Sequence, residues 1–218
     1  DGTVQHWWHP ISEEGRFTDI SDDLLWLPFV VAGYISETDD FGILKEKAAY
    51  YDGGSGTVYE HCLASIERVL KRLSPRGLTL MGEGDWNDGL NGVGVKWKGE
   101  SVWLAQFFVV VLNSFTELCA RQDKNDKRSA RYALAAQKLK KALMKHAFKG
   151  DRFMLATKDS GEVLGVESCK QGKFHLNPQT WAVISGVVEG EQAKKLMAMT
   201  EKRLYRNYGV LLFTPAYS

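Results

Sequence analysis

Residues 101–119 read SVWLAQFFVVVLNSFTELC, and their apolar side chains would cover nearly every face of a helix. A helix that is apolar all round is stable in water only when other elements of the fold surround it. We therefore predict a helix from Ser101 to Cys119 at the centre of the fold, buried on most of its sides.

Other predicted helices have one apolar face. In the stretch from Val58 to Leu73, for example, Cys62, Ile66 and Val69 fall on one stripe. Fully apolar helices that alternate with one-sided helices indicate an inner and an outer layer, so the expected fold class is all-α. The remaining helices are predicted at Leu24–Tyr34, Asn125–Phe148, Pro178–Val188 and Glu191–Leu204.

Two long connections separate these helices, Ser74–Glu100 and Lys149–Asn177. Long loops on a helical scaffold are where functional residues concentrate. The second connection contains a short stretch, Arg152–Thr157, that favours a strand. We expect the chemistry of this protein in the first connection.

Composition points to one globular domain over residues 1–218, without an internal boundary. A formal net charge of +1 gives no reason to expect nucleic acid or an anionic membrane as a partner. The longest apolar run, Phe107–Leu112, is much shorter than the roughly 20 residues that a membrane helix requires. The widely spaced Cys62, Cys119 and Cys169 suit reduced thiols, which predicts a cytoplasmic protein.

The loop at residues 78–91, LTLMGEGDWNDGLN, gathers acids, amides and glycines around one tryptophan. The flat face of Trp86 could stack on a pyranose ring, with Asp85 and Asn87 beside it as sugar contacts. A carboxyl group next to such a ring loses water, which raises its pKa and suits a general acid; Asp88 is the candidate. The alternative is an Asp- and Gly-rich turn anchored by one tryptophan.

A second aromatic and polar cluster, QHWWHP, occupies residues 5–10. Gln5, His6 and Trp7 are candidate linings of a sugar site, and simple packing is the alternative. His6 and His9 lack a third ligand with zinc-like spacing, so no metal site is predicted.

Four other features have more than one interpretation. Residues 21–23 (SDD) predict a helix cap, and Pro28 predicts a kink or a delayed start in the helix that follows. Glu100 either starts a helix or turns toward the site. Gln179, in the run NPQTW, caps a helix or contacts sugar. The basic residues of segment 124–145 predict a solvated face.

These stretches together are more specific than any one of them. Their amino-acid sequences and their order resemble those of the glycoside hydrolase family 94 phosphorylases, which include cellobiose, cellodextrin, chitobiose and β-1,2-oligoglucan phosphorylases. The resemblance runs along the whole chain and implies an (α/α)6-barrel catalytic domain, here partial and with long loops between helices. It rests on DGTVQHWWHP, ISDDLLWLP, YEHC, MGEGDWNDGLN, GESVWL and NPQTWAVISG.

The resemblance also implies a reaction. A β-linked gluco-disaccharide or oligosaccharide and inorganic phosphate give an α-sugar 1-phosphate with inversion, and no cofactor takes part. The family's general acid corresponds to Asp88, and the tryptophan that lines the site at the scissile sugar corresponds to Trp86. Phosphate is itself a nucleophile, so such an enzyme needs cationic groups and hydrogen-bond donors in place of a catalytic base.

The family's phosphate-binding stretches have no counterpart in this chain. One, an Arg-Asp-Ser run, would precede Asp1, and the other, a glycine-rich run with a histidine, would follow Ser218. We therefore expect the middle part of a catalytic domain, which associates with the rest of that domain or forms a homodimer.

Two alternatives stay open. An inverting hydrolase on the same scaffold would use Glu83 or Asp85 as a base to activate water. A non-catalytic sugar-binding fragment or subunit would bind sugar without turnover.

Overall fold

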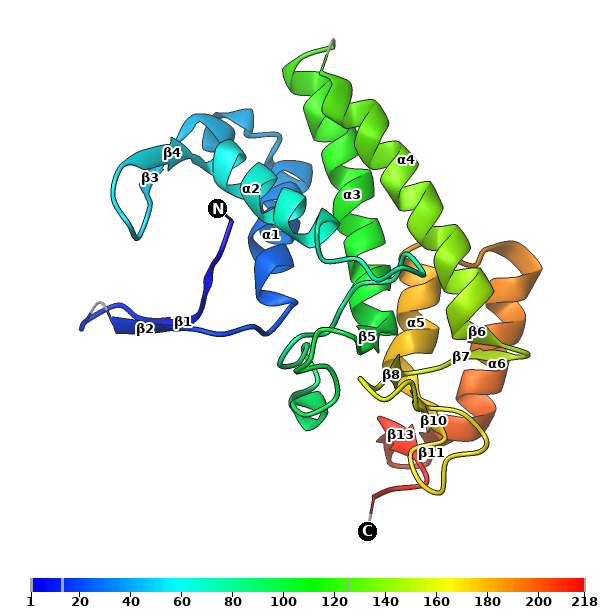
Figure 1. The fold of residues 1–218 in the computed structure, drawn as a ribbon. Helices are drawn as coiled ribbons and strands as arrows, with labels where there is room; N and C mark the ends of the chain where they lie inside the picture. The colour runs from blue at the N-terminus through cyan, green and yellow to red at the C-terminus, as the bar shows by residue number, and fades with distance from the viewer. Residues whose placement is uncertain (1, 13, 125, 218) are drawn as a thin grey trace.

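The computed structural model describes residues 2–12, 14–124 and 126–217. Six α-helices form the body of this part of the chain, and short strands and turns join them (Figure 1). The helices are α1 (Asp23–Thr38), α2 (Val58–Leu70), α3 (Val102–Gln122), α4 (Lys127–Ala142), α5 (Leu176–Ile184) and α6 (Gly190–Leu204).

The helices pack as three pairs in two layers, as the sequence pattern predicted. Helix α3 lies between α1 and α5, while α2, α4 and α6 pack against α1, α3 and α5 respectively (Figure 1). The inner row is therefore α1, α3 and α5, and the outer row is α2, α4 and α6. Three pairs leave the arrangement open, so the (α/α)6 barrel stays a prediction for a whole catalytic domain.

Helix α3 is the centre of the core, and its early residues are buried on every face. Its 21 residues are long and apolar enough for a membrane span by length and composition alone. In this fold its neighbours bury most of that surface, as in the core helix of a globular protein. The buried residues of α3 are Val102, Trp103, Leu104, Ala105, Gln106, Phe107, Phe108, Val109, Val111, Leu112, Phe115, Leu118 and Cys119.

The expectation of an all-α fold was incomplete, because small antiparallel ladders connect the helices. The expected strand at residues 152–157 is two strands, since Met154 and Leu155 separate β7 from β8. The pairs are β1 (Gln5–His9) with β2 (Glu14–Phe17), β3 (Lys47–Ala49) with β4 (Ser55–Thr57), β6 (Phe148–Lys149) with β7 (Arg152–Phe153), β10 (Phe174–His175) with β13 (Phe213–Thr214), and β11 (Tyr205–Arg206) with β12 (Gly209–Val210); β5 (Glu100–Ser101), β8 (Ala156–Thr157) and β9 (Val163–Leu164) form one three-stranded sheet.

The helix ends show which local signals were correct. Thr57 and Glu60 form a capping box at the start of α2, which ends at Leu70, three residues before the predicted end. Asp22 precedes α1, but its side chain makes no capping bond, so the predicted cap was wrong. Pro28 lies inside α1 and does not delay its start.

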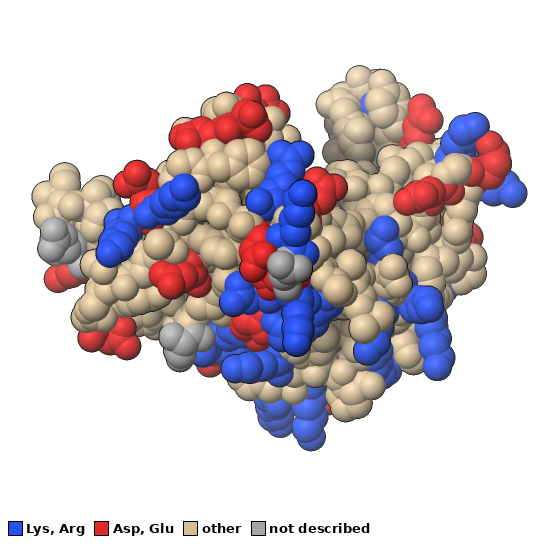
Figure 2. Space-filling view, turned by 90° about the horizontal axis from the view of Figure 1, so that it is seen from above, with Lys and Arg blue, Asp and Glu red and all other residues tan. Residues whose placement is uncertain are grey.

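Helix α4 begins at Lys127; Asn125, where we predicted its start, lies outside the described residues. Its apolar stripe, which includes Tyr132 and Leu139, faces α3, and most of its basic residues are exposed, as predicted. Some basic side chains are paired, for example Arg131 with Glu67. Seen from above, basic side chains gather in the centre and along the lower edge of this face, with acidic side chains among and above them (Figure 2).

Candidate active site

The loop that holds residues 82–90 is tied to the segment before α1. The Ser21 backbone N–H donates to the Gly84 carbonyl at 2.9 Å, and the Ser21 hydroxyl donates to the Met81 carbonyl at 2.6 Å. Gly82 has φ +63°, and a Cβ there would lie 2.2 Å from the Asp19 carbonyl oxygen. Only glycine fits at this crossing, which fixes the path of the loop.

Asp85 holds the loop from inside. Its carboxylate accepts a hydrogen bond from the Ser101 hydroxyl and another from the Asn87 backbone N–H at 2.9 Å. Burial raises the pKa of Asp85 above its ordinary value, while these two hydrogen bonds oppose the shift. Asp85 is 4% exposed and has both oxygens engaged, so its role is to position the loop.

Ser101 joins this loop to the core helix. Its Oγ accepts a hydrogen bond from the Leu104 backbone N–H at 3.0 Å, the N-cap contact of α3, and donates to Asp85. One hydroxyl therefore satisfies the first turn of α3 and a buried carboxylate of the site loop.

Trp86 forms the outer end of an aromatic wall. Its ring is 48% exposed, and its centroid lies 6.0 Å from that of the buried Trp103 on α3. Trp103 in turn stacks on Phe107 at 5.3 Å and meets Trp181 of α5 edge-on at 5.7 Å. These contacts fix the tryptophan rings as an apolar wall beside the loop. Such a surface suits the CH groups of a sugar ring.

Asp88 is the first residue of a short 3-10 turn, η2 (Asp88–Leu90). The side chain of Asn87 caps this turn by accepting from the Gly89 backbone N–H at 3.1 Å. Asp88 is exposed in the described part of the chain. The described residues therefore do not remove water from its carboxyl group, contrary to our expectation. It projects from an anchored turn, next to residues that line a pocket.

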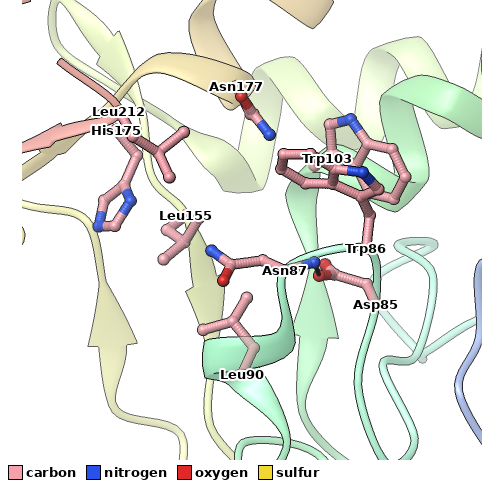
Figure 3. Close-up of a pocket in the computed structure, with 9 residues that line it drawn as sticks. All are labelled: Asp85, Trp86, Asn87, Leu90, Trp103, Leu155, His175, Asn177 and Leu212. Carbon is pink, nitrogen blue, oxygen red and sulfur yellow. Dashed lines mark hydrogen bonds between the residues drawn. The ribbon is translucent and has the colours of Figure 1, made fainter.

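The pocket beside this turn combines three elements that are distant in the sequence (Figure 3). The loop contributes Asp85, Trp86 and Asn87, and the start of α5 contributes Asn177. His175, just before α5, and Trp103 were not predicted, because neither carries a local signal that distinguishes a site residue from a core residue. The full lining is Asp85, Trp86, Asn87, Leu90, Trp103, Leu155, His175, Asn177 and Leu212.

The predicted sugar contacts near the N-terminus do not line this pocket. Gln5, His6 and Trp7 lie on β1, part of an exposed hairpin (Figure 1). His6 Nδ1 lies 3.0 Å from a carboxylate oxygen of Asp23 in the first turn of α1. Trp7 is 51% exposed, so the hairpin presents its aromatic rings to the outside of the described chain.

Gln179 has a structural position. Its side chain is fully buried, its Oε1 accepts from the Phe153 backbone N–H at 2.8 Å, and its Nε2 donates to the carbonyls of Phe153 and His175 at 2.8 and 3.0 Å. The side-chain amide is hydrogen-bonded to backbone groups behind the pocket wall, and Gln179 does not line the pocket. The expected sugar contact is therefore not seen at Gln179.

Glu100 lies at the start of a helix, which was one of its two predicted positions, and its side chain does not line the pocket. It is 2% exposed, it pairs with the Arg76 guanidinium, and it accepts from the Thr157 hydroxyl at 3.1 Å. These partners hold the carboxylate, so Glu100 has a structural position on β5, directly before α3.

Asp22 is a second buried acid behind the loop. Burial raises its pKa to about 6, against a hydrogen bond from Trp26 Nε1 at 2.7 Å, and the charges of Asp23 and Asp85 add to the shift. Its other oxygen, Oδ1, has no hydrogen-bond partner among the described residues. Ionised Asp22 is therefore a destabilising group in the folded chain.

We predict that Asp22→Asn stabilises the protein at neutral pH. The folded-state pKa lies above the unfolded value, so the wild type loses stability as pH rises from about 4 to about 6 and stays lower above that range. The variant should gain roughly 2 kcal/mol at pH 7 and nothing at pH 3.5. Urea unfolding at both pH values measures the difference, with the exposed Asp39→Asn as control. An equal change at both pH values would contradict the assignment.

Asp159 holds residues 96–99, at the C-terminal end of the connection that contains the site loop. Its carboxylate accepts the backbone N–H groups of Lys96, Lys98 and Gly99 at 2.8–2.9 Å. Loss of water is the largest single effect and raises the pKa of Asp159, but the three hydrogen bonds together outweigh it and lower the pKa. The stabilisation is present above the ordinary value of 3.8 and is lost as pH falls through the lower folded-state value.

We predict that Asp159→Ala opens residues 96–99 without unfolding the core. Three backbone donors lose their acceptor, so their amide hydrogens should exchange at least about tenfold faster at pH 7. Hydrogen exchange followed by mass spectrometry measures this, and residues 102–112 of α3 serve as the internal control. Unchanged protection at residues 96–99 would show that the clamp is unnecessary.

The comparison with known proteins decides the family. Residues 1–218 match the catalytic domain of the glycosyl hydrolase 94 superfamily. The chain belongs to this family. Solabiose phosphorylase of Paenibacillus borealis is 37% identical over the whole chain, which covers 28% of that protein. Cellobionic acid phosphorylase of Neurospora crassa is 33% identical over 91% of the chain, and the match covers 25% of that protein.

Not every similar protein carries the name of a phosphorylase. The cyclic β-(1,2)-glucan synthase NdvB of Rhizobium meliloti is 35% identical over 99% of the chain, which covers 8% of that protein. The chain spans about a quarter of the length of the two phosphorylases above. Family membership therefore fixes the kind of domain, and the reaction of the whole protein is a separate question.

A solved structure supports the same helical arrangement. The rhamnosidase from Klebsiella oxytoca with rhamnose bound has a TM-score of 0.64 over 93% of this chain and 34% of that chain, at 16% identity. At this identity the likeness concerns the fold alone.

Proposed function

We propose that the family 94 protein to which this chain belongs is an inverting glycoside phosphorylase. It would convert a β-linked gluco-disaccharide or oligosaccharide and inorganic phosphate into an α-sugar 1-phosphate, with Asp88 as general acid. Its curated relatives include a solabiose and a cellobionic acid phosphorylase, which supports this reaction class.

One observation carries the proposal: of the three acids in the site loop, Asp88 is the one whose carboxyl group makes no hydrogen bond to the described residues. Asp88 is exposed on a capped turn, whereas both oxygens of Asp85 accept hydrogen bonds inside the loop. An inverting hydrolase needs a second carboxylate free to activate water, while a phosphorylase needs only the acid. Glu83, the other candidate base, accepts the Asp19 backbone N–H at 3.0 Å through Oε2 and helps to hold the loop.

Trp86 would hold the scissile sugar next to Asp88. Its half-exposed ring continues the wall formed by Trp103, and the side chains of Asn87 and Asn177 enter the same pocket (Figure 3). An apolar face with a few polar groups is the usual composition of a small-molecule site. Phosphate would be bound by residues outside this chain, as the resemblance implies.

The same proposal includes association with the rest of a catalytic domain. Helix α1 exposes Leu27, Val30 and Tyr34 at spacings of three and four residues, so they share one face. Such a stripe suits contact with another helix. We retain the cytoplasm as the proposed location, because Cys62, Cys119 and Cys169 are all free.

The test is the dependence of turnover on phosphate. The intact protein, incubated with β-linked glucose disaccharides, should release α-glucose 1-phosphate in phosphate buffer and no product in phosphate-free buffer. The anomer can be identified by proton NMR during the first turnovers. Equal turnover without phosphate would replace the proposal by the hydrolase alternative, and sugar binding without turnover would replace it by the binding-subunit alternative.

A further inference from the structure

His175 is a polar side chain in an apolar setting at the pocket wall. It is 4% exposed, its ring stacks on Phe213 at 5.0 Å and 25°, and Leu155 and Leu212 line the pocket with it. Within the described residues its Nε2 is buried and has no hydrogen-bond partner of normal geometry. Packing alone would be served better by an apolar ring, because a buried imidazole without partners loses its hydration.

The two ring nitrogens have different surroundings. Nε2 is fully buried beside the backbone of Gly172, whose Cβ, if present, would lie 3.0 Å from it. In Figure 3 the opposite edge of the ring, which carries Nδ1, is turned toward Leu155 and Asn87. Nδ1 is therefore the nitrogen that a pocket ligand can reach.

The surroundings also define the protonation of His175. Burial lowers its pKa to about 4, so the ring is neutral at neutral pH. The Gly172 backbone opposes this shift, and Nε2 is the ring nitrogen beside Gly172, so we assign the proton of the neutral ring to Nε2. Nδ1 then presents a lone pair to the pocket and acts as a hydrogen-bond acceptor.

We propose that His175 is a specificity-determining residue that accepts, through Nδ1, a hydrogen bond from one hydroxyl group of the sugar ring stacked on Trp86. The inference rests on the proposed function, because it assumes that this pocket binds a sugar. The loop supplies the apolar face for the ring, and the segment before α5 supplies a fixed acceptor at its edge. β10 pairs with β13, which places Phe213 opposite His175 and fixes the imidazole.

Two substitutions separate the hydrogen bond from the packing. His175→Phe keeps the stacking on Phe213 and removes both nitrogens, while His175→Asn places an amide near the position of Nδ1. The control is His146→Asn, because His146 follows α4 and does not line the pocket. All four proteins are tested as the intact enzyme at pH 7.

The probes are methyl β-D-glucopyranoside and its 2-, 3-, 4- and 6-deoxy analogues, with dissociation constants from calorimetry. In the wild type and the control, one deoxy analogue should bind about tenfold more weakly than the parent glycoside. His175→Phe should bind the parent glycoside more weakly by a similar factor, and it should bind that deoxy analogue as well as it binds the parent. His175→Asn should restore part of the difference between the two ligands. The same deoxy pattern in His175→Phe and in the wild type would overturn the inference.

The result is distinguishable from a failure of the proposed function. Phosphorolysis with an unchanged deoxy pattern in His175→Phe would overturn the role of His175 alone. Loss of the penalty in His175→Phe, together with turnover that ignores phosphate, would support His175 and overturn the phosphorylase.

Discussion

Asp88→Asn is expected to reduce phosphorolysis by the intact protein by about 10²–10⁴-fold, the usual contribution of a general acid. The amide keeps the shape of the side chain and its place on η2 but has no proton to give to the leaving oxygen. Stability should change little, because Asp88 is exposed and the turn is capped by Asn87. Initial rates of sugar 1-phosphate release measure the effect.

The leaving group provides a sharper diagnosis of this role. An aryl β-glucoside with an acidic phenol needs little protonation, so the loss of rate in Asp88→Asn should be much smaller for it than for a disaccharide. Asp52→Asn, on the exposed turn between β3 and β4, is the matched control and should retain full activity. Equal losses on both substrates would assign Asp88 a binding role, and full activity on the disaccharide would end the assignment.

Gln179→Met is expected to destabilise the fold by about 3 kcal/mol. The methionine fills a similar volume, but it leaves the Phe153 N–H and the Phe153 carbonyl without their buried partner and removes the contact to the His175 carbonyl. For a domain of this size, this corresponds to a melting temperature lower by roughly 6–12 °C. Calorimetry or circular dichroism measures the shift.

The control for this change is Gln137→Met on the exposed face of α4, which should stay within about 0.5 kcal/mol of the wild type. The experiment also separates two roles of Gln179. A stable Gln179→Met variant with weaker sugar binding would restore the sugar contact that the sequence suggested. A less stable variant with normal binding at low temperature would establish the structural role.

The sequence predicted the layers of this fold because α3 is apolar all round. Within a globular fold, a central position buries a helix such as Val102–Cys119, and one-sided helices such as α4 then have to cover it. The two-residue ladders were not predictable, because their pairing depends on where the helices place the loops. The cap at Asp22 was misjudged for a similar reason, since its carboxylate turned to Trp26 within α1.

The candidate site was predictable at Trp86 and the residues beside it because one short loop holds them together. His175 and Trp103 enter the pocket only after α3 and α5 have packed, and nothing in the residues around them distinguishes them from core residues. Gln179 shows the opposite error, since an amide in a conspicuous motif has its partners inside the protein. The role of Asp88 stays a prediction.

The hydroxyl group of Ser101 has a consequence for anyone who engineers this scaffold. The same oxygen caps the central helix and holds the carboxylate that shapes the site loop. Heat that frays the first turn of α3 therefore also releases the loop, so inactivation should accompany the first loosening of the helix rather than its final melting. Efforts to improve thermal tolerance would have to begin at this residue's neighbours and leave the serine in place.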